Sequence, residues 1–253
     1  MSGGFEGSLV EHDSGDVKVR IEGRIAQVTI DRPSKRNALT QAMYQTMADA
    51  LLQADTDPGI GAVVIGGVAD VFTSGNDLAD FVAGNSLDET TRFLEAISSV
   101  HVPVLAAVNG IAVGVGFTML LHCDLVFVEP TADLFAPFVQ LGLVPEAASS
   151  LLLPRVVGER RAAEIILTGR HLSGAEAVEW GLANASASPV LPAALETAER
   201  VAAQPHAAAR ASKALLRSRE LTVQGRMAEE MAAFSEALKG PEFAAVMAAR
   251  KAR

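Results

Sequence analysis

The sequence predicts an α/β fold followed by an all-helical C-terminal part. Three short apolar runs, residues 62–65, 102–108 and 125–128, have the β-branched content and the length of fully buried strands. Helical patterns separate these runs, and buried strands that alternate with helices pair in parallel through crossover connections. At 253 residues, the chain is long enough for one large domain or two small ones.

A hairpin and a helix are predicted before the first buried strand. Residues 17–22 alternate between apolar and charged side chains, which is the period of a half-buried strand. A turn at Gly23 leads into a second strand over residues 25–30, which Pro33 ends. Thr40 is a suitable N-cap for a helix that runs to about residue 54.

Helices dominate the second half of the predicted structure. They are expected around residues 90–100, 117–122 and 159–167, and Ser173 begins a capping box that opens another. The alanine-rich C-terminal part is expected to break at Pro205, Gly225 and Gly240-Pro241, and no strand pattern returns in the last hundred residues. We therefore divide the chain into a flexible lead-in, a core and a helical C-terminal region, over residues 1–16, 17–190 and 191–253.

Composition and charge narrow the functional classes. Apolar residues make up 49% of the chain and charged residues 20%, as in globular proteins. A formal net charge of −9 argues against a nucleic-acid-binding surface. The single cysteine excludes an intrachain disulfide, and the histidines have no metal-ligand spacing. Without a membrane-spanning or secretory segment, we expect a cytoplasmic protein that binds neither membrane nor metal.

Two glycine-containing motifs lie where a predicted buried strand gives way to a helix. In Ser74-Gly75-Asn76-Asp77-Leu78, the glycine permits a backbone that exposes N–H groups. Residues 109–116 carry three glycines and lead into an apolar helix, whose N-terminus stabilises negative charge. Their spacing fits neither a dinucleotide fingerprint nor a P-loop. Ordinary turns and close helix–strand packing are the alternative interpretations.

A third motif contains an isolated glutamate. Glu146 is the only acidic residue between Leu134 and Gly158, and leucines and valines surround it in the sequence. An apolar environment disfavours the ionised carboxylate, so its pKa should rise toward the working range of a general base. The alternative is a glutamate at the start of a helix that faces water and is stabilised by the helix dipole.

Taken together, these motifs resemble the crotonase (enoyl-CoA hydratase/isomerase) superfamily over about residues 17–250. The resemblance rests on Asp31-Arg32-Pro33, Asn37-Ala38-Leu39, the motif at 74–78, Asn109-Gly110, Cys123-Asp124, Leu167-Thr168-Gly169-Arg170 and Trp180-Gly181-Leu182. It implies a spiral of ββα turns with a helical C-terminal trimerisation region. It also implies an acyl-CoA thioester as substrate, no separate cofactor, and a homo-oligomer, either trimer or hexamer.

The resemblance further implies where the substrate binds. Family members hold a thioester enolate with two backbone N–H groups, which correspond here to those of Asn76 and Val115. The backbone of residues 74–78 would face the CoA adenine, and Lys35 and Arg36 are phosphate partners unless they belong to a solvated loop. The remaining substrate-binding positions implied in this way are Ser74, Gly75, Asp77, Leu78, Gly114, Thr118 and Phe138.

The sequence departs from the hydratases at their two catalytic glutamates. Thr118 and Phe138 occupy those positions, and a hydroxyl and a phenyl ring cannot jointly activate and protonate water. Glu146 stands where hydratases usually carry glycine. Together with Ser212-Lys213, it looks like the peroxisomal-type Δ3,Δ2-enoyl-CoA isomerases, in which this glutamate is the sole acid/base.

We therefore expect an isomerase that moves a 3-enoyl-CoA double bond to the 2-trans position, with Glu146 as the catalytic residue. The enzymatic alternatives are an enoyl-CoA hydratase and another crotonase-type acyl-CoA reaction such as thioester hydrolysis. The non-enzymatic alternative is an acyl-CoA-binding paralogue that has lost turnover. A binding protein would have no need of a lone carboxylate in an apolar pocket.

Overall fold

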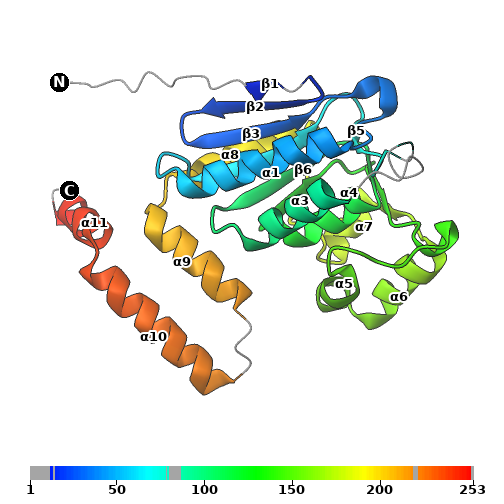
Figure 1. Ribbon diagram of the computed structural model, residues 1–253. Coiled ribbons are helices and arrows are strands. Elements are labelled where there is room, and N and C mark those ends of the chain that lie inside the picture. The colour runs from blue at the N-terminus through cyan, green and yellow to red at the C-terminus, as the bar shows by residue number, and fades with distance from the viewer. Residues whose placement is uncertain (1–11, 14, 78, 80–86, 219–221, 252–253) are drawn as a thin grey trace.

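The fold contains two β-sheets (Figure 1). The computed structural model describes residues 12–13, 15–77, 79, 87–218 and 222–251. The first sheet has seven strands in the order β1-β2-β3-β4-β6-β8-β11. Their bounds are His12–Asp13, Val17–Glu22, Ile25–Ile30, Ala62–Gly67, Val104–Val108, Leu125–Val128 and Ala185–Ser186.

The strands predicted from the sequence form the body of this sheet. β2 and β3 are the expected antiparallel hairpin, with Val17 opposite Ile30. β3, β4, β6 and β8 pair in parallel, as the alternation of buried strands and helices predicted. Of the expected lead-in, residues 1–11 and 14 lie outside the described residues, whereas His12 and Asp13 pair with β2.

The second sheet was not predicted. Its order is β10-β9-β7-β5, with bounds Leu172–Ser173, Asp133–Phe135, Ile111–Val113 and Val71–Thr73. The expectation that no strand returns in the last hundred residues was wrong, because β10 and β11 pair there with β9 and β8. Strands of two or three residues carry no readable period, so only tertiary pairing reveals them.

Each successive strand–strand–helix repeat of the chain contributes one strand to each sheet. β4 and β5 precede α3 (Asp88–Ser99), and β6 and β7 precede α4 (Val115–Thr118). In each turn the first strand joins the seven-stranded sheet and the second joins the four-stranded one. β5 and β7 are parallel, so their C-terminal ends lie at the same edge of the second sheet. The predicted helix at 117–122 is instead this short α4 followed by a 3-10 turn, η2 (Met119–His122).

Helices cover both faces of the first sheet. α1 (Gln41–Thr56) lies beside α3 on one face, and α8 (Val190–Ala202) packs on the other (Figure 1). Thr40 is the N-cap of α1, as predicted, and accepts a hydrogen bond from the Met43 N–H at 3.4 Å. The other helical segments are η1 (Pro33–Lys35), η3 (Val139–Leu141), α5 (Ser149–Val157), α6 (Glu159–Thr168) and α7 (Gly174–Glu179).

The chain ends in three further helices, α9 (His206–Arg217), α10 (Val223–Lys239) and α11 (Pro241–Lys251), which lie to one side of the sheets (Figure 1). The predicted breaks at Pro205 and Gly240-Pro241 are present. Gly225 does not break a helix. It lies in the first turn of α10, where its N–H donates to the side chain of the N-cap Thr222.

A buried cluster of charged side chains attaches α9 to the seven-stranded sheet. Lys213 is only 5% exposed, and its Nζ lies 2.8 Å from an Asp124 carboxylate oxygen and 2.6 Å from the carbonyl oxygen of Val102. Arg217 contacts the other oxygen of Asp124 at 2.9 Å and donates to the carbonyl of His122. Asp124 also accepts from the N–H of Val104, so the cluster joins α9 to the first residue of β6.

We expect Lys213→Met to lower the free energy of unfolding by about 3 kcal/mol, because it removes one partner of a buried ion pair. Equilibrium urea unfolding at a fixed protein concentration measures this change. The matched control is Lys239→Met, whose 3.1 Å pair with Glu236 is exposed and should contribute about 0.5 kcal/mol or less. Equal losses in the two variants would contradict a stabilising role for the cluster.

Candidate active site

The candidate site lies at the edge where β5 and β7 end. β5 continues into residues 74–77, and β7 continues through Gly114 into α4. The two segments touch: a Cβ added to Gly75 would lie 2.9 Å from the Val113 carbonyl oxygen. One added to Gly116 would lie 2.4 Å from Cγ2 of Thr73. Open α/β sheets bind ligands at the carboxyl ends of their strands, which is where these segments meet.

Two backbone N–H groups are left available at this edge. Gly114 has φ +57°, a conformation that favours glycine, and it makes Val115 the first residue of α4, where the N–H has no acceptor within the helix. Leu39 pairs with both neighbours of Asn76: its N–H donates to Gly75 and its carbonyl accepts from Asp77. Within the described residues, neither the Asn76 nor the Val115 N–H donates a hydrogen bond to the backbone.

Glu146 reaches the same region from the loop before α5. The hydroxyl of Thr118, one turn after Val115 on α4, donates to Glu146 Oε1. Glu146 Oε2 is buried and has no hydrogen-bond partner among the described residues. Burial raises the pKa of this carboxyl above its ordinary value, and the Thr118 hydrogen bond opposes part of the rise. The water-facing alternative for Glu146 is therefore wrong.

The backbone around Glu146 is held in an unusual conformation. Ala147 and Ala148 both have left-handed backbone angles, with φ of 50° and 52°. Such residues cost about 1 kcal/mol or more each, and persist only where their surroundings enforce them. His122 Nε2 donates to the Ala147 carbonyl at 2.8 Å, and Ser149 Oγ donates to the Glu146 carbonyl at 2.6 Å. These contacts hold the backbone from which the Glu146 side chain extends.

The two positions that the resemblance assigns to the hydratase glutamates have different surroundings. Thr118 is fully buried and contacts Glu146 directly. Phe138 is 7% exposed and belongs to the main hydrophobic core. The structure thus brings Thr118 and Glu146 together, and Glu146 supplies the carboxylate beside Thr118.

The predicted phosphate partners lie beside the β5 loop. The carbonyl of Arg36 accepts from the N–H of Ser74 at 3.1 Å, and the side chains of Lys35 and Arg36 are exposed. Asp77 does not lie free in the site. Its carboxylate pairs with Arg32 at 2.7 Å, which is the main cause that lowers the pKa of Asp77. Leu78 lies outside the described residues.

Sequence reasoning did not identify Tyr44. Its ring is fully buried on the inner face of α1, and its hydroxyl donates to Asn76 Oδ1 at 2.5 Å. Tyr44 is the only tyrosine of the chain, and it interrupts an otherwise apolar helix face. A polar group at the end of a buried aromatic side chain needs a partner, and this was the signal that could have identified it.

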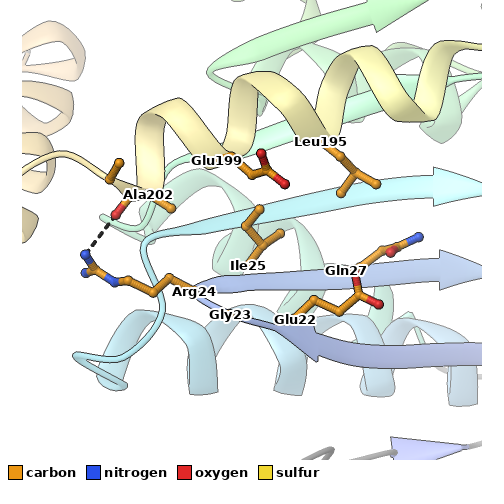
Figure 2. A pocket seen from close by; sticks show the side chains of 9 residues that line it. Glu22, Gly23, Arg24, Ile25, Gln27, Leu195, Glu199 and Ala202 are labelled. Carbon is orange, nitrogen blue, oxygen red and sulfur yellow. Dashed lines mark hydrogen bonds between the residues drawn. The ribbon is translucent and has the colours of Figure 1, made fainter. Parts of the chain in front are cut away.

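A separate pocket of about 410 Å³ lies between the β2–β3 hairpin and α8 (Figure 2). Arg24 lines this pocket and donates to the Ala202 carbonyl at 2.8 Å, and Ile25 and Leu195 are among its apolar lining residues. Glu22, another lining residue, pairs with Arg20. None of the predicted site residues lines this pocket, so we do not assign the chemistry to it.

Two absences hold for the described part of the chain. It contains no group of three or more histidine, cysteine, aspartate or glutamate side chains that could bind a metal ion. Nor does any helix there combine the length and the apolar character needed to cross a membrane.

Comparison with known proteins identifies the relatives of this chain. Residues 20–247 match the family model for enoyl-CoA hydratase/isomerase. The chain is 35% identical over 251 residues to "Probable enoyl-CoA hydratase EchA14" of Mycobacterium tuberculosis. This match covers 94% of this chain and 98% of that protein. It is 38% identical over 189 residues to enoyl-CoA delta isomerase 2 of Rattus norvegicus, covering 71% of this chain and 48% of that one.

A solved enoyl-CoA hydratase/isomerase from Pseudoalteromonas atlantica T6c is also similar in structure. It has a TM-score of 0.79 and 40% sequence identity, over 94% of this chain and 98% of that one. The relatives carry both hydratase and isomerase names, so the choice between these reactions depends on the residues of the site.

The raised pKa of Glu146 predicts a pH-dependent stability. The folded state holds this proton to a higher pH than the unfolded chain does, so the stabilisation is present below the ordinary pKa of 4.5 and is lost as pH rises through the folded value. We expect Glu146→Gln to match the wild-type Tm at pH 4 and to exceed it by about 2 °C at neutral pH. Thermal unfolding at a series of pH values measures this.

Glu176 is the matched control, because hydrogen bonds from Ser173 lower its pKa. Glu176→Gln should therefore lose Tm at neutral pH relative to acid pH. A constant Tm difference between wild type and Glu146→Gln across the pH range would contradict the assigned environment of Glu146.

Proposed function

This chain belongs to the enoyl-CoA hydratase/isomerase family, and we propose that it is a one-base isomerase that converts a 3-enoyl-CoA thioester to the 2-trans isomer. One observation carries the proposal. Glu146 presents a buried oxygen with no hydrogen-bond partner among the described residues. Thr118 and Phe138 occupy the positions that the resemblance assigns to the two hydratase glutamates. A single carboxylate is sufficient for proton transfer between two carbons of the same substrate, and the reaction needs no cofactor.

In the proposed reaction Glu146 acts first as base and then as acid. Oε2 takes a proton from C2, and the electrons of that C–H bond form an enolate with negative charge on the thioester oxygen. The Asn76 and Val115 N–H groups bind that oxygen. The carboxylic acid then returns the proton to C4, the double bond moves from C3–C4 to C2–C3, and the thioester carbonyl re-forms. No water or electron enters or leaves.

The electrostatics of the site support this sequence of steps. A raised carboxyl pKa brings Glu146 closer to the pKa of a carbon acid and makes it a stronger base than an exposed glutamate. The enolate oxygen would lie near the first residue of α4, whose N–H has no acceptor within the helix and can donate to it. In other enzymes, removal of one such N–H donor costs roughly 3–4 kcal/mol of transition-state stabilisation.

Water addition is less well supported by the same residues. Hydration requires one group that removes a proton from water and another that protonates the substrate carbon. The Thr118 hydroxyl already donates to Glu146, and Phe138 has no ionisable group. Lys35 and Arg36, beside the β5 loop, would bind the phosphates of CoA in either reaction.

We expect Glu146→Gln to lower kcat for isomerisation of a 3-enoyl-CoA by about a thousandfold, since an amide cannot accept the C2 proton. Purified wild type and variant are assayed in parallel on a 3-enoyl-CoA and a 2-enoyl-CoA. Wild type should isomerise the first and hydrate the second only slowly.

A control variant separates catalysis from local damage. Glu129→Gln changes a carboxylate outside the candidate site and should leave kcat unchanged. Isomerisation that survives in Glu146→Gln would contradict the mechanism. Rapid hydration by wild type would favour the hydratase. Binding of both thioesters without turnover would favour the non-catalytic paralogue.

We also propose that the chain forms a homotrimer or a dimer of trimers through its C-terminal helices. None of the residues of α10, all of which the structure describes, is buried. Met227, Met231, Phe234 and Leu238 recur at intervals of three or four residues, and each is at least 44% exposed. Such a stripe on one face of a helix is normally covered by another apolar surface.

Sedimentation of the purified chain should give three or six times its mass of 26.4 kDa. Phe234→Glu places a charge in the middle of the stripe and should shift the distribution toward the monomer, whereas Glu230→Gln on the same helix should not. A stable wild-type monomer would contradict the proposal.

A further inference from the structure

Tyr44 is a buried polar group that the proposed proton transfer does not use. It lies in the first turns of α1, is fully buried, and packs at a ring-centroid distance of 5.5 Å from Phe93 of α3. The phenol stays neutral because burial, and then the negative charge of Glu146, raises the pKa of Tyr44 well above its ordinary value. Its hydroxyl is therefore a permanent hydrogen-bond donor.

The acceptor of that donor is the residue whose N–H is assigned to the enolate oxygen. Tyr44 donates to Asn76 Oδ1 at 2.5 Å. The backbone around Asn76 is held on both sides by Leu39, at 2.8 Å to Gly75 and 2.9 Å to Asp77. The bond to the Gly75 carbonyl holds the peptide group that contains the Asn76 N–H, and the bond from Asp77 holds the peptide group that follows Asn76. The bond from Tyr44 adds a third contact, which acts on Asn76 through its side chain.

We propose that Tyr44 is a positioning residue: its phenol binds the Asn76 side chain and, together with the Leu39 bond to the Gly75 carbonyl, fixes the direction of the Asn76 N–H toward the enolate oxygen. The inference rests on the proposed function, because it requires that this N–H stabilise an enolate. Preorganised donors are effective because they need no reorientation as charge develops, and small misplacements of such groups cost large factors in rate.

Kinetics of single and double variants test the inference. Tyr44→Phe removes only the hydroxyl, and Asn76→Ala removes the acceptor but keeps the N–H. Each is expected to lower kcat about tenfold with less than a twofold change in KM, which is a smaller loss than removal of the donor itself. Because both changes break one interaction, the double variant should lose no more than about twofold beyond either single variant.

Two controls exclude a merely structural role. Met47→Leu is a volume-conserving change at a fully buried position on the same helix, and it should leave kcat unchanged. The acidic limb of the kcat–pH profile reports the ionisation of Glu146. Its position on the pH axis should be the same in Tyr44→Phe as in wild type. Multiplicative losses in the double variant, or a displaced acidic limb, would overturn the inference in favour of an effect through packing or through Glu146.

A binding measurement tests the inference without turnover. Acetoacetyl-CoA ionises to an enolate, whereas butyryl-CoA does not. Tyr44→Phe and Asn76→Ala should each weaken binding of acetoacetyl-CoA about tenfold and that of butyryl-CoA less than twofold. Equal weakening of both ligands, or of neither, would overturn the inference. If wild type does not turn over a 3-enoyl-CoA but the binding difference is found, the isomerase proposal fails and the positioning role stands.

Discussion

The parallel pairing of β5 with β7 determines where the candidate site forms. Each strand has only three residues, yet their pairing places the loop after β5 and the start of α4 at one sheet edge. Two close approaches make that pairing dependent on glycine, because a side chain at Gly75 or Gly116 would overlap backbone or side-chain atoms of the neighbouring segment. The available N–H groups of Asn76 and Val115 follow from this geometry rather than from any reactive side chain.

The chemistry supported by the site depends on which side chains accompany those N–H groups. α4 presents Thr118 one turn after Val115, and the loop before α5 presents Glu146 to Thr118. One oxygen of this carboxylate is bound and the other has no partner among the described residues, an arrangement suited to accept and return a single proton. The resemblance implies that glutamates at positions 118 and 138 would give the same backbone a different reaction, so the fold alone does not specify the chemistry.

Much of this arrangement could be predicted from the sequence. The hairpin, the buried parallel strands and the cap at Thr40 have local signals, and the isolation of Glu146 among apolar residues indicated its unusual environment. The second sheet could not be predicted, since its strands are too short to show a period. The bond between Tyr44 and Asn76 joins residues 32 positions apart, and no local pattern specifies such a contact.

The contacts of His122 link the carboxylate loop to the C-terminal helices. Its carbonyl accepts from Arg217 of α9, and its ring binds the Ala147 carbonyl next to Glu146. His122 therefore connects the C-terminal helical region, which carries the exposed apolar stripe, to the backbone next to Glu146. A truncation that removes α9 would remove this contact between Arg217 and His122. The core and its C-terminal helices therefore depend on each other structurally, and they are poor candidates for recombination as independent modules.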